Sequence, residues 1–238
     1  MHIFGLKGKW RMKKKLIVIE GLDGSGKNTQ AKKLKDWLAR KNQNVKMVSF
    51  PDYNSNSSAL VKMYLSGDFG TDPDSVNPYA ASSFFAVDRF ASFKTNWQDF
   101  YENSGIIIAD RYTTSNGVHQ CSKLPKEDWD KFLDWLFCYE YKYMQIPEPD
   151  LVIYLEMDIN ESQNLIRKRY ENDESKKDIH ERDTDYLRKS AEAANYCAEK
   201  YNWKTVNCIK NGHLRSIDDI FDEVSRIAEN YFSETNIF

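Results

Sequence analysis

The stretch LIVIEGLDGSGKNTQ, residues 16–30, decides the fold. Its first four residues are an apolar run, so residues 16–20 are typical of a buried strand, and residues 27–41 carry apolar side chains at helical spacing. A phosphate-binding loop is written G-x-x-x-x-G-K-[ST] and needs this strand before it and this helix after it. Backbone N–H groups and the helix N-terminus hold a phosphate, while the lysine adds a mobile positive charge. The stretch predicts a nucleotide phosphate site that comprises Gly21, Gly24, Ser25, Gly26, Lys27, Asn28 and Thr29.

One position departs from this pattern, because Asn28 follows Lys27 where a hydroxyl residue is usual. Thr29 cannot simply substitute, since one residue along a helix turns the side chain by about 100°. The amide oxygen of Asn28 is a hard ligand of the kind that Mg²⁺ prefers, and a water molecule can also bridge. We expect Mg²⁺ to depend mainly on carboxylates, with Asn28 as an occasional or indirect ligand, so the candidate metal ligands are Asp110, Asp23 and Asn28.

Asp110 ends a second apolar run, GIIIAD at residues 105–110, and a dense polar run follows it. Ligands of an open parallel sheet gather at the carboxyl ends of the strands, so Asp110 should face the loop; an exposed strand-end acid is the alternative. Arg111 beside this acid suggests a bidentate grip on a phosphate. A structural turn would also explain such a polar run. The donors and acceptors that it adds for a polar ligand are Ser115, Asn116, His119 and Gln120.

Short apolar runs alternate with longer segments of helical periodicity along the whole chain. This alternation predicts an α/β fold of three layers, with a mostly parallel five-stranded sheet between helices. Together with the phosphate-binding loop it indicates the P-loop NTPase fold, and the family resemblance described below implies a short lid. Without repeats or linkers, residues 12–238 form one predicted domain. The predicted strands are 16–20, 45–50, 105–110, 150–156 and 204–207, and the predicted helices are 27–41, 57–65, 77–101, 126–144, 160–169, 182–201 and 216–231.

Composition narrows the class of protein. The chain has 238 residues, 41% of them hydrophobic, with a net charge of -2, so the total charge does not demand a nucleic acid or an anionic membrane. Its apolar runs are too short for a membrane-spanning helix. The four cysteines form no C-x-x-C pair, which argues against structural zinc and predicts reduced thiols in a cytoplasmic protein.

The first residues look like an addition to the domain. The run MKKKLIVIEG, which begins at Met12, reads as a complete protein start. We expect residues 1–11 to be a mis-called or vector-derived extension, or else a real and poorly ordered tail.

The segment YENDESKKDIHE, residues 170–181, joins two predicted helices. It is highly charged and lacks apolar periodicity. Both a mobile lid and a plain solvated loop fit such a segment, and its position alone slightly favours the loop.

With these residues in place, the sequence resembles the thymidylate kinases, nucleoside monophosphate kinases that phosphorylate dTMP. Four stretches carry the resemblance: GLDGSGKNTQ, FPDY after the second strand, FFAVDRF in the long helix, and DRYTTSNGVHQ. KKDIHERD, at the place of the family's lid, is a weaker fifth. The likeness covers residues 13–238, and its DRY-x-x-S-N-x-x-H-Q run is more specific than the phosphate loop.

The resemblance implies an acceptor pocket for dTMP. Phe85 would stack on the thymine ring, although an aromatic at helical spacing usually belongs to the core. Arg89, four positions later on the same helix face, would hydrogen-bond the base, and Asn116 would face it too. His119 would lie under the deoxyribose and help to exclude a 2′-hydroxyl, while Arg111 would hold the dTMP phosphate. The remaining pocket residues would be Phe50, Tyr53, Ser115 and Gln120.

Two departures from the family pattern shift where positive charge must come from. Some members carry a catalytic arginine in the phosphate loop where this chain has Gly24, and others take the charge from the lid. Tyr53 stands where some relatives place an arginine, so the grip on phosphate should rest more on Arg111. The lid spans about residues 167–182, and its central charged segment has lysines, which are point charges and cannot bond two phosphate oxygens at once as an arginine can. Its candidate cations are Arg167 and Arg169, which we also assign to ATP, together with Lys176, Lys177 and Arg182.

The implied reaction is transfer of the ATP γ-phosphoryl group to dTMP, with Mg²⁺ as cofactor. Such transfer needs positioning and charge neutralisation more than covalent catalysis. A deoxynucleoside kinase of the same fold and a non-catalytic nucleotide-binding protein with an impaired metal site remain alternatives. The resemblance also implies a homodimer, and the aromatic-rich helix at 126–144 could be core or interface. The predicted catalytic residues are Lys27, Asp23, Asp110 and Arg111.

Overall fold

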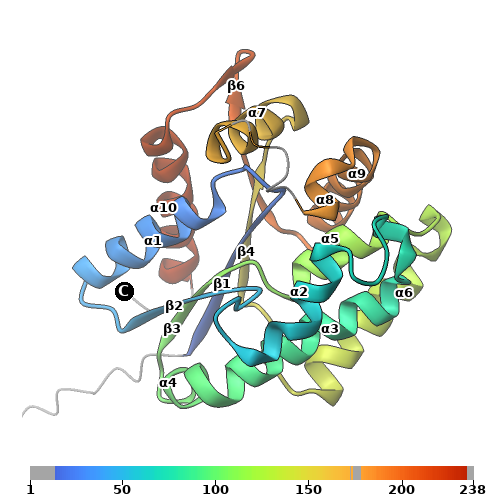
Figure 1. Ribbon diagram of the computed structural model, residues 1–238. Helices are drawn as coiled ribbons and strands as arrows, with labels where there is room; N and C mark the ends of the chain where they lie inside the picture. The colour runs from blue at the N-terminus through green and yellow to red at the C-terminus, as the bar shows by residue number, and fades with distance from the viewer. Residues whose placement is uncertain (1–13, 172, 174–177, 235–238) are drawn as a thin grey trace, which may run out of the picture.

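The computed structural model of the chain describes residues 14–171, 173 and 178–234. Five parallel strands form its central sheet in the order β2-β3-β1-β4-β5 (Figure 1). This confirms the predicted fold class, and the predicted strand ends agree within one residue. The strands are β1 (Lys15–Gly21), β2 (Val45–Ser49), β3 (Ile106–Asp110), β4 (Leu151–Glu156) and β5 (Lys204–Asn207).

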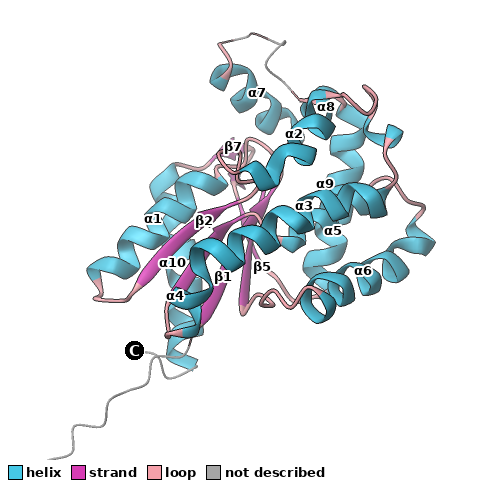
Figure 2. Ribbon diagram, turned by 60° about the horizontal axis from the view of Figure 1, so that its bottom comes forward, coloured by secondary structure: helices cyan, strands magenta, loops and turns pink. Residues whose placement is uncertain are grey.

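Helices cover both faces of the sheet. Helices α1 and α10 pack on one face, and α5, α6 and α9 pack on the other, as Figures 1 and 2 show. The α-helices among the described residues are α1 (Lys27–Arg40), α2 (Ala59–Ser66), α3 (Pro78–Ser92), α4 (Gln98–Glu102), α5 (Thr113–Cys121), α6 (Trp129–Phe137), α7 (Ile159–Arg169), α8 (Ile179–Arg182), α9 (Thr184–Lys200) and α10 (Ile217–Glu234).

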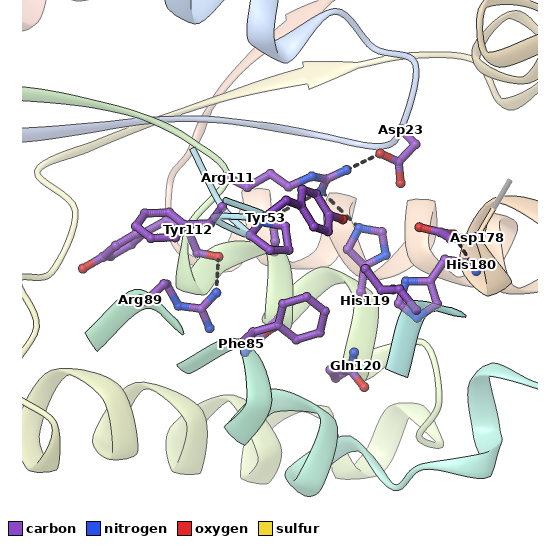
Figure 3. A pocket seen from close by; sticks show the side chains of 15 residues that line it. Asp23, Tyr53, Phe85, Arg89, Arg111, Tyr112, His119, Gln120, Asp178 and His180 are labelled. Carbon is purple, nitrogen blue, oxygen red and sulfur yellow. Dashed lines mark hydrogen bonds and ion pairs between the residues drawn. The ribbon is translucent and has the colours of Figure 1, made fainter. Parts of the chain in front are cut away.

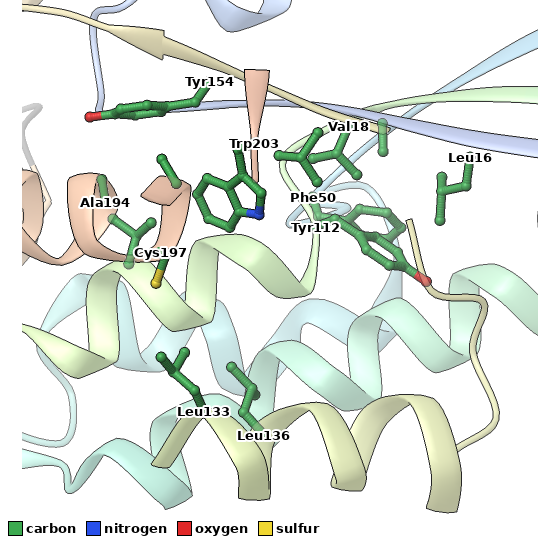
Figure 4. Close-up of a cluster of buried hydrophobic side chains, with 14 of the residues drawn as sticks. Leu16, Val18, Phe50, Tyr112, Leu133, Leu136, Tyr154, Ala194, Cys197 and Trp203 are labelled. Atoms are coloured by element: carbon green, nitrogen blue, oxygen red, sulfur yellow. The ribbon is translucent and has the colours of Figure 1, made fainter. Parts of the chain in front are cut away.

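Side-chain alternation along β1 explains the two helical layers. Leu16 and Val18 face one layer, whereas Ile17 and Ile19 face the other, and all four are fully buried. Successive strand residues point to opposite faces, so a strand covered on both faces reads as one apolar run. Each such side chain contributes about 1.5–3 kcal/mol by leaving water. Figure 4 shows the layer on the Leu16 side, where Trp203 packs beneath the strands.

Three elements differ from the sequence prediction. The polar run after Asp110 is helix α5 rather than an irregular turn, and all nine of its residues are buried. Residues 179–182 form the short helix α8 instead of continuing a charged loop. A two-stranded hairpin follows β5. Its strands are β6 (Ile209–Lys210) and β7 (His213–Leu214).

The two long helices predicted at 77–101 and 126–144 each contain a π-helical segment. Phe93–Trp97 links α3 to α4, and Cys138–Tyr143 extends α6. The aromatic-rich helix packs into the core through Trp129, Phe132, Leu133 and Leu136. Three short 3-10 helices complete the described chain at Asn56–Ser58, Pro73–Ser75 and Lys126–Asp128.

Strand register brings the candidate site together at one edge of the sheet. Asp110, the last residue of β3, pairs with Ile19 of β1 and with Ser49 of β2. The glycine-rich loop leaves β1 two residues after Ile19. The carboxyl ends of three neighbouring strands therefore place the loop, the FPDY turn and the start of α5 around one opening.

Two predictions about environment can be compared with the structure. Within the described ranges, no helix combines the length and apolar character that crossing a membrane requires. The four cysteines are free thiols, and Cys121, Cys197 and Cys208 are buried. The predicted N-terminal extension, residues 1–11, lies outside the described residues.

Candidate active site

The glycine-rich loop joins β1 to α1 and borders a cavity. Gly26 caps α1 with a φ of 86°, a left-handed conformation that glycine adopts without strain. Lys27 is buried, and its Nζ donates to the Leu22 carbonyl at 2.7 Å. Burial lowers the pKa of Lys27 to about 8, and the nearby Arg111 adds to this effect. Two of the predicted loop residues, Gly21 and Ser25, are buried and do not line the cavity. The other five do line it, namely Gly24, Gly26, Lys27, Asn28 and Thr29.

Close packing on α7 explains the glycine at position 24. Gly24 has a φ of 78°, and a Cβ there would lie 2.6 Å from the Ser162 carbonyl oxygen and 3.2 Å from Ile166. The Ser162 hydroxyl also donates to the Asp23 carbonyl, which fastens α7 to the loop. An arginine cannot occupy position 24 while α7 packs this closely. Positive charge for a phosphate must therefore come from another element.

Asn28 and Asp110 meet across the loop cavity. The Asn28 amide donates to Asp110 Oδ2 at 2.9 Å, and the Ser49 hydroxyl lies 3.5 Å from the same oxygen. Asp110 thus faces the loop, as predicted, and is not an exposed strand-end acid. Carboxylate, amide and hydroxyl oxygens are hard donors that suit Mg²⁺. Among the described residues, no group of three or more His, Cys, Asp and Glu side chains is arranged to hold a metal ion.

Arg111 lies between the loop and the polar helix. It has a φ of 66°, a left-handed conformation that is unusual for arginine, and it comes directly before α5. Its Nη2 donates to Asp23 Oδ1 at 2.6 Å, and its Nη1 lies 3.8 Å from Glu20. Burial alone would raise the pKa of Asp23, but Arg111 and Lys27 more than offset this and hold that pKa well below its usual value. The Asp23 carboxylate is therefore turned to Arg111, while Asn28 turns to Asp110.

Beyond Arg111 a second cavity opens between α3 and α5 (Figure 3). Phe85 is only partly buried, so it forms a wall of this cavity while it also packs against the small apolar cluster around Tyr64. Tyr64 packs edge-on against Phe85, with ring centroids 6.2 Å apart. All the predicted acceptor residues line this cavity, namely Phe50, Tyr53, Phe85, Arg89, Arg111, Ser115, Asn116, His119 and Gln120.

Arg89 reaches the cavity from α3 and is held by a buried carboxylate. Its Nε and Nη2 donate to the two oxygens of Glu140 at 2.7 and 2.6 Å, and its Nη1 donates to the Tyr112 carbonyl at 3.4 Å. Burial would lower the pKa of Arg89, but the Glu140 carboxylate more than offsets this and raises it. Arg89 is therefore charged and has two N–H groups beyond these three bonds.

Two histidine rings stack beside the cavity. His119 and His180 lie 5.6 Å apart with 12° between their planes, and Tyr64 Oη lies 2.9 Å from His180 Nε2. Burial, assisted by Arg111, lowers the pKa of His119 to about 3, so the ring is neutral near pH 7. Arg111 only donates, so His119 Nε2 accepts at 3.3 Å and the ring proton lies on Nδ1.

Two residues that line the cavity have buried polar atoms available to a ligand. Among the described residues, the Gln120 amide and His119 Nδ1 are buried without a hydrogen-bond partner. A buried polar group without a partner costs about 1–3 kcal/mol. Ser115 differs, because its hydroxyl donates to Glu20 at 2.8 Å and accepts from Arg111 at 3.3 Å. Ser115 thus supports Arg111 as well as lining the cavity.

The charged segment after α7 contributes residues to both cavities: His180 lines the acceptor cavity, Glu181 lines the loop cavity, and Asp178 lines both. Ile179, His180 and Glu181 are each at most 5% exposed, so the plain-loop interpretation is wrong for residues 179–181. Ile179 packs with Tyr64 and Leu65 in a small apolar cluster. Of the candidate cations, Arg169 lines the loop cavity, whereas Arg167 is exposed and does not line it. Lys176, Lys177 and the side chain of Arg182 lie outside the described residues.

Asp178 stands where this segment meets the loop. It accepts from the backbone N–H groups of His180 and Glu181 at 2.8 Å and so caps α8. Burial raises the pKa of Asp178 to about 7, and the Asp23 carboxylate adds to this rise. The cavities adjoin here, because the residues that line both of them are Asp23, Phe50, Pro51, Tyr53, Arg111 and Asp178.

Several residues of this site were missed by the sequence analysis. Glu20 and Glu140 are carboxylates at 0% exposure within apolar segments, and that placement is the signal that could have found them. Tyr64 looks like a core aromatic, and nothing near it in sequence separates it from one. Asp178 and His180 belong to the segment that read as solvated.

Comparison with known proteins identifies the chain's relatives. The sequence model of the thymidylate kinase family matches residues 19–215. The chain belongs to the thymidylate kinase family. It is 30% identical over 172 residues to the thymidylate kinase of Mycobacterium tuberculosis, which covers 71% of this chain and 79% of the relative. It is 27% identical over 217 residues to a probable thymidylate kinase of Thermococcus onnurineus, and 24% identical over 221 residues to the thymidylate kinase of Danio rerio.

These thymidylate kinases align over most of this chain. The Thermococcus alignment covers 90% of it and 97% of the relative, and the Danio alignment covers 92% and 91%. The family match begins within β1 and runs to Arg215, before α10. It therefore includes the glycine-rich loop, the cavity between α3 and α5, and the segment that carries α8.

Proposed function

We propose that the chain catalyses ATP-dependent phosphorylation of dTMP to dTDP. One observation carries this proposal: the loop cavity and the α3–α5 cavity adjoin at Arg111 and Asp23. A phosphate loop on one side suits a nucleotide donor. An arginine at the junction suits an acceptor that itself carries a phosphate. An acceptor phosphate bound there would lie beside the γ-phosphate held by the loop.

On the donor side, Lys27 and the N–H groups that begin α1 hold the β- and γ-phosphates of ATP. The pKa of Lys27 is lowered to about 8 by burial, and a bound polyphosphate would raise it again and keep the lysine charged. Arg169, which lines this cavity, supplies the charge that Gly24 cannot. Mg²⁺, where bound, neutralises phosphate charge and would be held by Asp110, with Asn28 or a water molecule as a further ligand.

On the acceptor side, Phe85 stacks on the thymine ring and Arg89 bonds its edge. His119 lies under the deoxyribose, where its ring helps to exclude a 2′-hydroxyl. Arg111 binds the 5′-phosphate, because its fork matches two phosphate oxygens. Asp23 competes with that phosphate for Arg111, because Arg111 Nη2 already donates to Asp23 Oδ1 at 2.6 Å.

The transfer itself needs alignment and neutralisation of charge. A phosphate oxygen of dTMP forms a bond to the γ-phosphorus, and the bond from that phosphorus to the β–γ bridging oxygen breaks, which releases ADP. Arg111 holds the attacking oxygen close to the γ-phosphate and offsets their mutual repulsion. Closure of residues 167–182 excludes water and so limits wasteful hydrolysis of ATP.

Two rival functions predict different assays. A deoxynucleoside kinase acts on a nucleoside hydroxyl and has no need for Arg111 at the acceptor. A non-catalytic nucleotide-binding protein would bind ATP through the loop but release no ADP. Formation of ADP with dTMP, with thymidine and with no acceptor separates the three. Faster turnover of thymidine would favour the first rival, and ATP binding without dTMP-dependent ADP would favour the second.

The grip on phosphate can be tested with a matched pair of variants. Arg111→Lys keeps the charge but loses the fork, so we expect KM for dTMP to rise by about tenfold or more. Arg215→Lys is the control, since Arg215 binds Asp219 and Glu223 away from both cavities. An unchanged KM in Arg111→Lys would remove Arg111 from the acceptor site.

The remaining proposals concern surroundings. The four free thiols support a cytoplasmic protein. The family resemblance favours a homodimer. It also favours ATP and dTMP as the ligands, and it gives no reason to expect a nucleic acid polymer or a membrane as a partner. A single domain over residues 12–238 with a lid at about 167–182 is our proposal for the domain organisation. Light scattering with size exclusion would measure the oligomeric state, and a monomer at micromolar concentration would contradict the dimer.

A further inference from the structure

Glu140 connects the residues that face the acceptor base. It lies at 0% exposure in the π-helical segment Cys138–Tyr143. Its carboxylate accepts from Arg89 at 2.6 and 2.7 Å, from the Thr113 hydroxyl at 2.8 Å, and from the Asn116 amide at 3.4 Å. Arg89 comes from α3, and the other two come from α5. One carboxylate thus joins both helices that line the cavity.

These bonds determine which atom of Asn116 faces a ligand. The Asn116 nitrogen donates to the Ser82 carbonyl at 3.2 Å as well as to Glu140. Both partners only accept, so the amide oxygen cannot turn toward them. Asn116 lines the cavity, and its oxygen is left as an acceptor for a ligand there. This orientation follows from the chemistry of the partners rather than from the placement of hydrogen atoms.

Arg89 presents the opposite polarity. Three of its five N–H groups are used by Glu140 and the Tyr112 carbonyl, and a guanidinium offers donors alone. Figure 3 shows Arg89 and Phe85 in the same cavity. A ring stacked on Phe85 therefore meets a donor from Arg89 and an acceptor from Asn116.

We propose that Glu140 is a positioning residue that makes the site select 4-oxo over 4-amino pyrimidines, an inference that rests on the proposed function. Thymine and uracil carry a 4-oxo acceptor beside an N3–H donor, which complements Arg89 and Asn116. Cytosine carries a 4-amino donor beside an N3 acceptor, so each contact would pair like with like. Glu140 keeps both side chains in the orientation that enforces this difference.

The energetics of the pair support a role beyond stability. Burying two charges costs several kcal/mol each, and apolar residues of similar volume are often at least as stable. A π-helical turn is itself uncommon and occurs frequently at functional sites. Glu140 forms a buried ion pair and lies in a π-helical segment. Its hydrogen bonds reach α3 and α5, the two helices that carry the residues proposed to face the base.

Two variants of Glu140 separate polarity from packing. Glu140→Gln keeps the size but brings N–H donors toward Arg89 and Asn116, which frees Asn116 to turn. Glu140→Asp keeps an acceptor-only group but shortens its reach. Glu192→Gln is the matched control, because Glu192 forms an exposed ion pair with Lys126. The readout is kcat/KM for dTMP and for deoxycytidine monophosphate, with KM for ATP and thermal unfolding measured alongside.

We expect Glu140→Gln to reduce the dTMP preference over deoxycytidine monophosphate by about tenfold or more, since one mispaired buried hydrogen bond has that effect. Glu140→Asp should raise KM for dTMP but keep most of the preference, and Glu192→Gln should match the wild type. An unchanged ratio in a folded Glu140→Gln protein, or equal losses in both variants, would overturn the proposal.

The remaining outcomes are also decisive. A wild-type enzyme that does not phosphorylate dTMP contradicts the proposed function itself. If the wild type does prefer dTMP, the variants then test the role of Glu140 alone. If both Glu140 variants fail to unfold cooperatively, Thr113→Val removes one bond to Glu140 and leaves its charge pair intact. That variant should lower the dTMP preference by about twofold to fivefold, and an unchanged preference would then overturn the proposal.

Discussion

The acceptor cavity and the phosphate-loop cavity differ in how firmly their residues are held. Arg89, Asn116 and His119 are each at most 7% exposed, and each is bonded to a neighbouring side chain. In the loop cavity, Lys27 and Asp110 are buried, but Asn28, Thr29 and Arg169 are exposed. The acceptor side is therefore preorganised, whereas the donor side is completed by the nucleotide and by the segment after α7.

This difference has a physical cause. A base is recognised by direction, so its partners must be fixed by packing and by a supporting layer of hydrogen bonds. A polyphosphate is recognised largely by charge and by backbone N–H groups, which a helix N-terminus already supplies. The donor side can therefore leave some of its side chains, such as that of Arg169, in solvent until ATP binds.

Removal of Lys27 should have the largest effect. Lys27→Met keeps the apolar stem but removes the charge, so kcat should fall by about a thousandfold while dTMP affinity changes little. The measurement is steady-state kinetics together with dTMP binding. Lys33→Met on the same helix is the control, because Lys33 pairs with the exposed Asp218. A loss of dTMP binding in Lys27→Met would contradict the separation of the two cavities.

Truncation of Phe85 tests the acceptor side. Phe85→Ala removes the stacking surface, so KM for dTMP should rise by about tenfold to a hundredfold. KM for ATP should stay within about threefold, since Phe85 lines only the acceptor cavity of the two. Phe221→Ala, which truncates a similarly half-buried ring on α10, is the control. Equal rises of both KM values would indicate a general loss of structure instead.

Asp178 gives a prediction about pH. Its pKa is raised to about 7, so the folded carboxyl keeps its proton where the unfolded chain has released it near pH 4. Stability from this group is present below about pH 4 and is lost as pH rises toward 7. Asp178→Asn cannot titrate and still caps α8, so it should become more stable than wild type by up to about 4 kcal/mol above pH 7, since one pKa unit corresponds to about 1.4 kcal/mol. Denaturant unfolding from pH 4 to pH 8 measures this, and a constant difference would refute it.

The smallest effect is expected at Asn28. Asn28→Ala should lower kcat by less than about fivefold, because Asn28 is an indirect ligand at most, whereas Asp110→Ala should lose more than about tenfold. Titration of activity with Mg²⁺ compares the two variants. A stronger Mg²⁺ dependence in Asn28→Ala than in Asp110→Ala would reverse the proposed assignment.

Features that depend on residues close together in the sequence could be predicted, whereas features that depend on contacts between distant residues could not. The strand pattern around Leu16 and the glycine-rich loop are local, so the sheet and the phosphate site could be predicted. Helix α5 could not, because its polar residues lack apolar periodicity and are buried by distant elements, namely α3, α6, α9 and the end of β1. The pairing of Glu140 with Arg89 joins residues 51 positions apart. Only the packed fold brings them together.

The lid shows a similar limit. Residues 178–181 carry one strongly apolar side chain, Ile179, among charged neighbours, so their burial depends on a cluster from α2 and α3. In the sequence, Gly24 marked only a position where some relatives have an arginine. The structure shows that α7 lies too close to position 24 for any side chain there. In both cases the deciding partner lies on another element of the fold.

Calorimetric titration of dTMP into the protein without ATP tests the central claim most directly. A preorganised acceptor cavity predicts that dTMP binds on its own, with a Kd within about threefold of the value measured with a non-hydrolysable ATP analogue and Mg²⁺ present. If dTMP binds only when the donor nucleotide is present, or if the two Kd values differ by more than about tenfold, the acceptor cavity is not preformed and the account is contradicted.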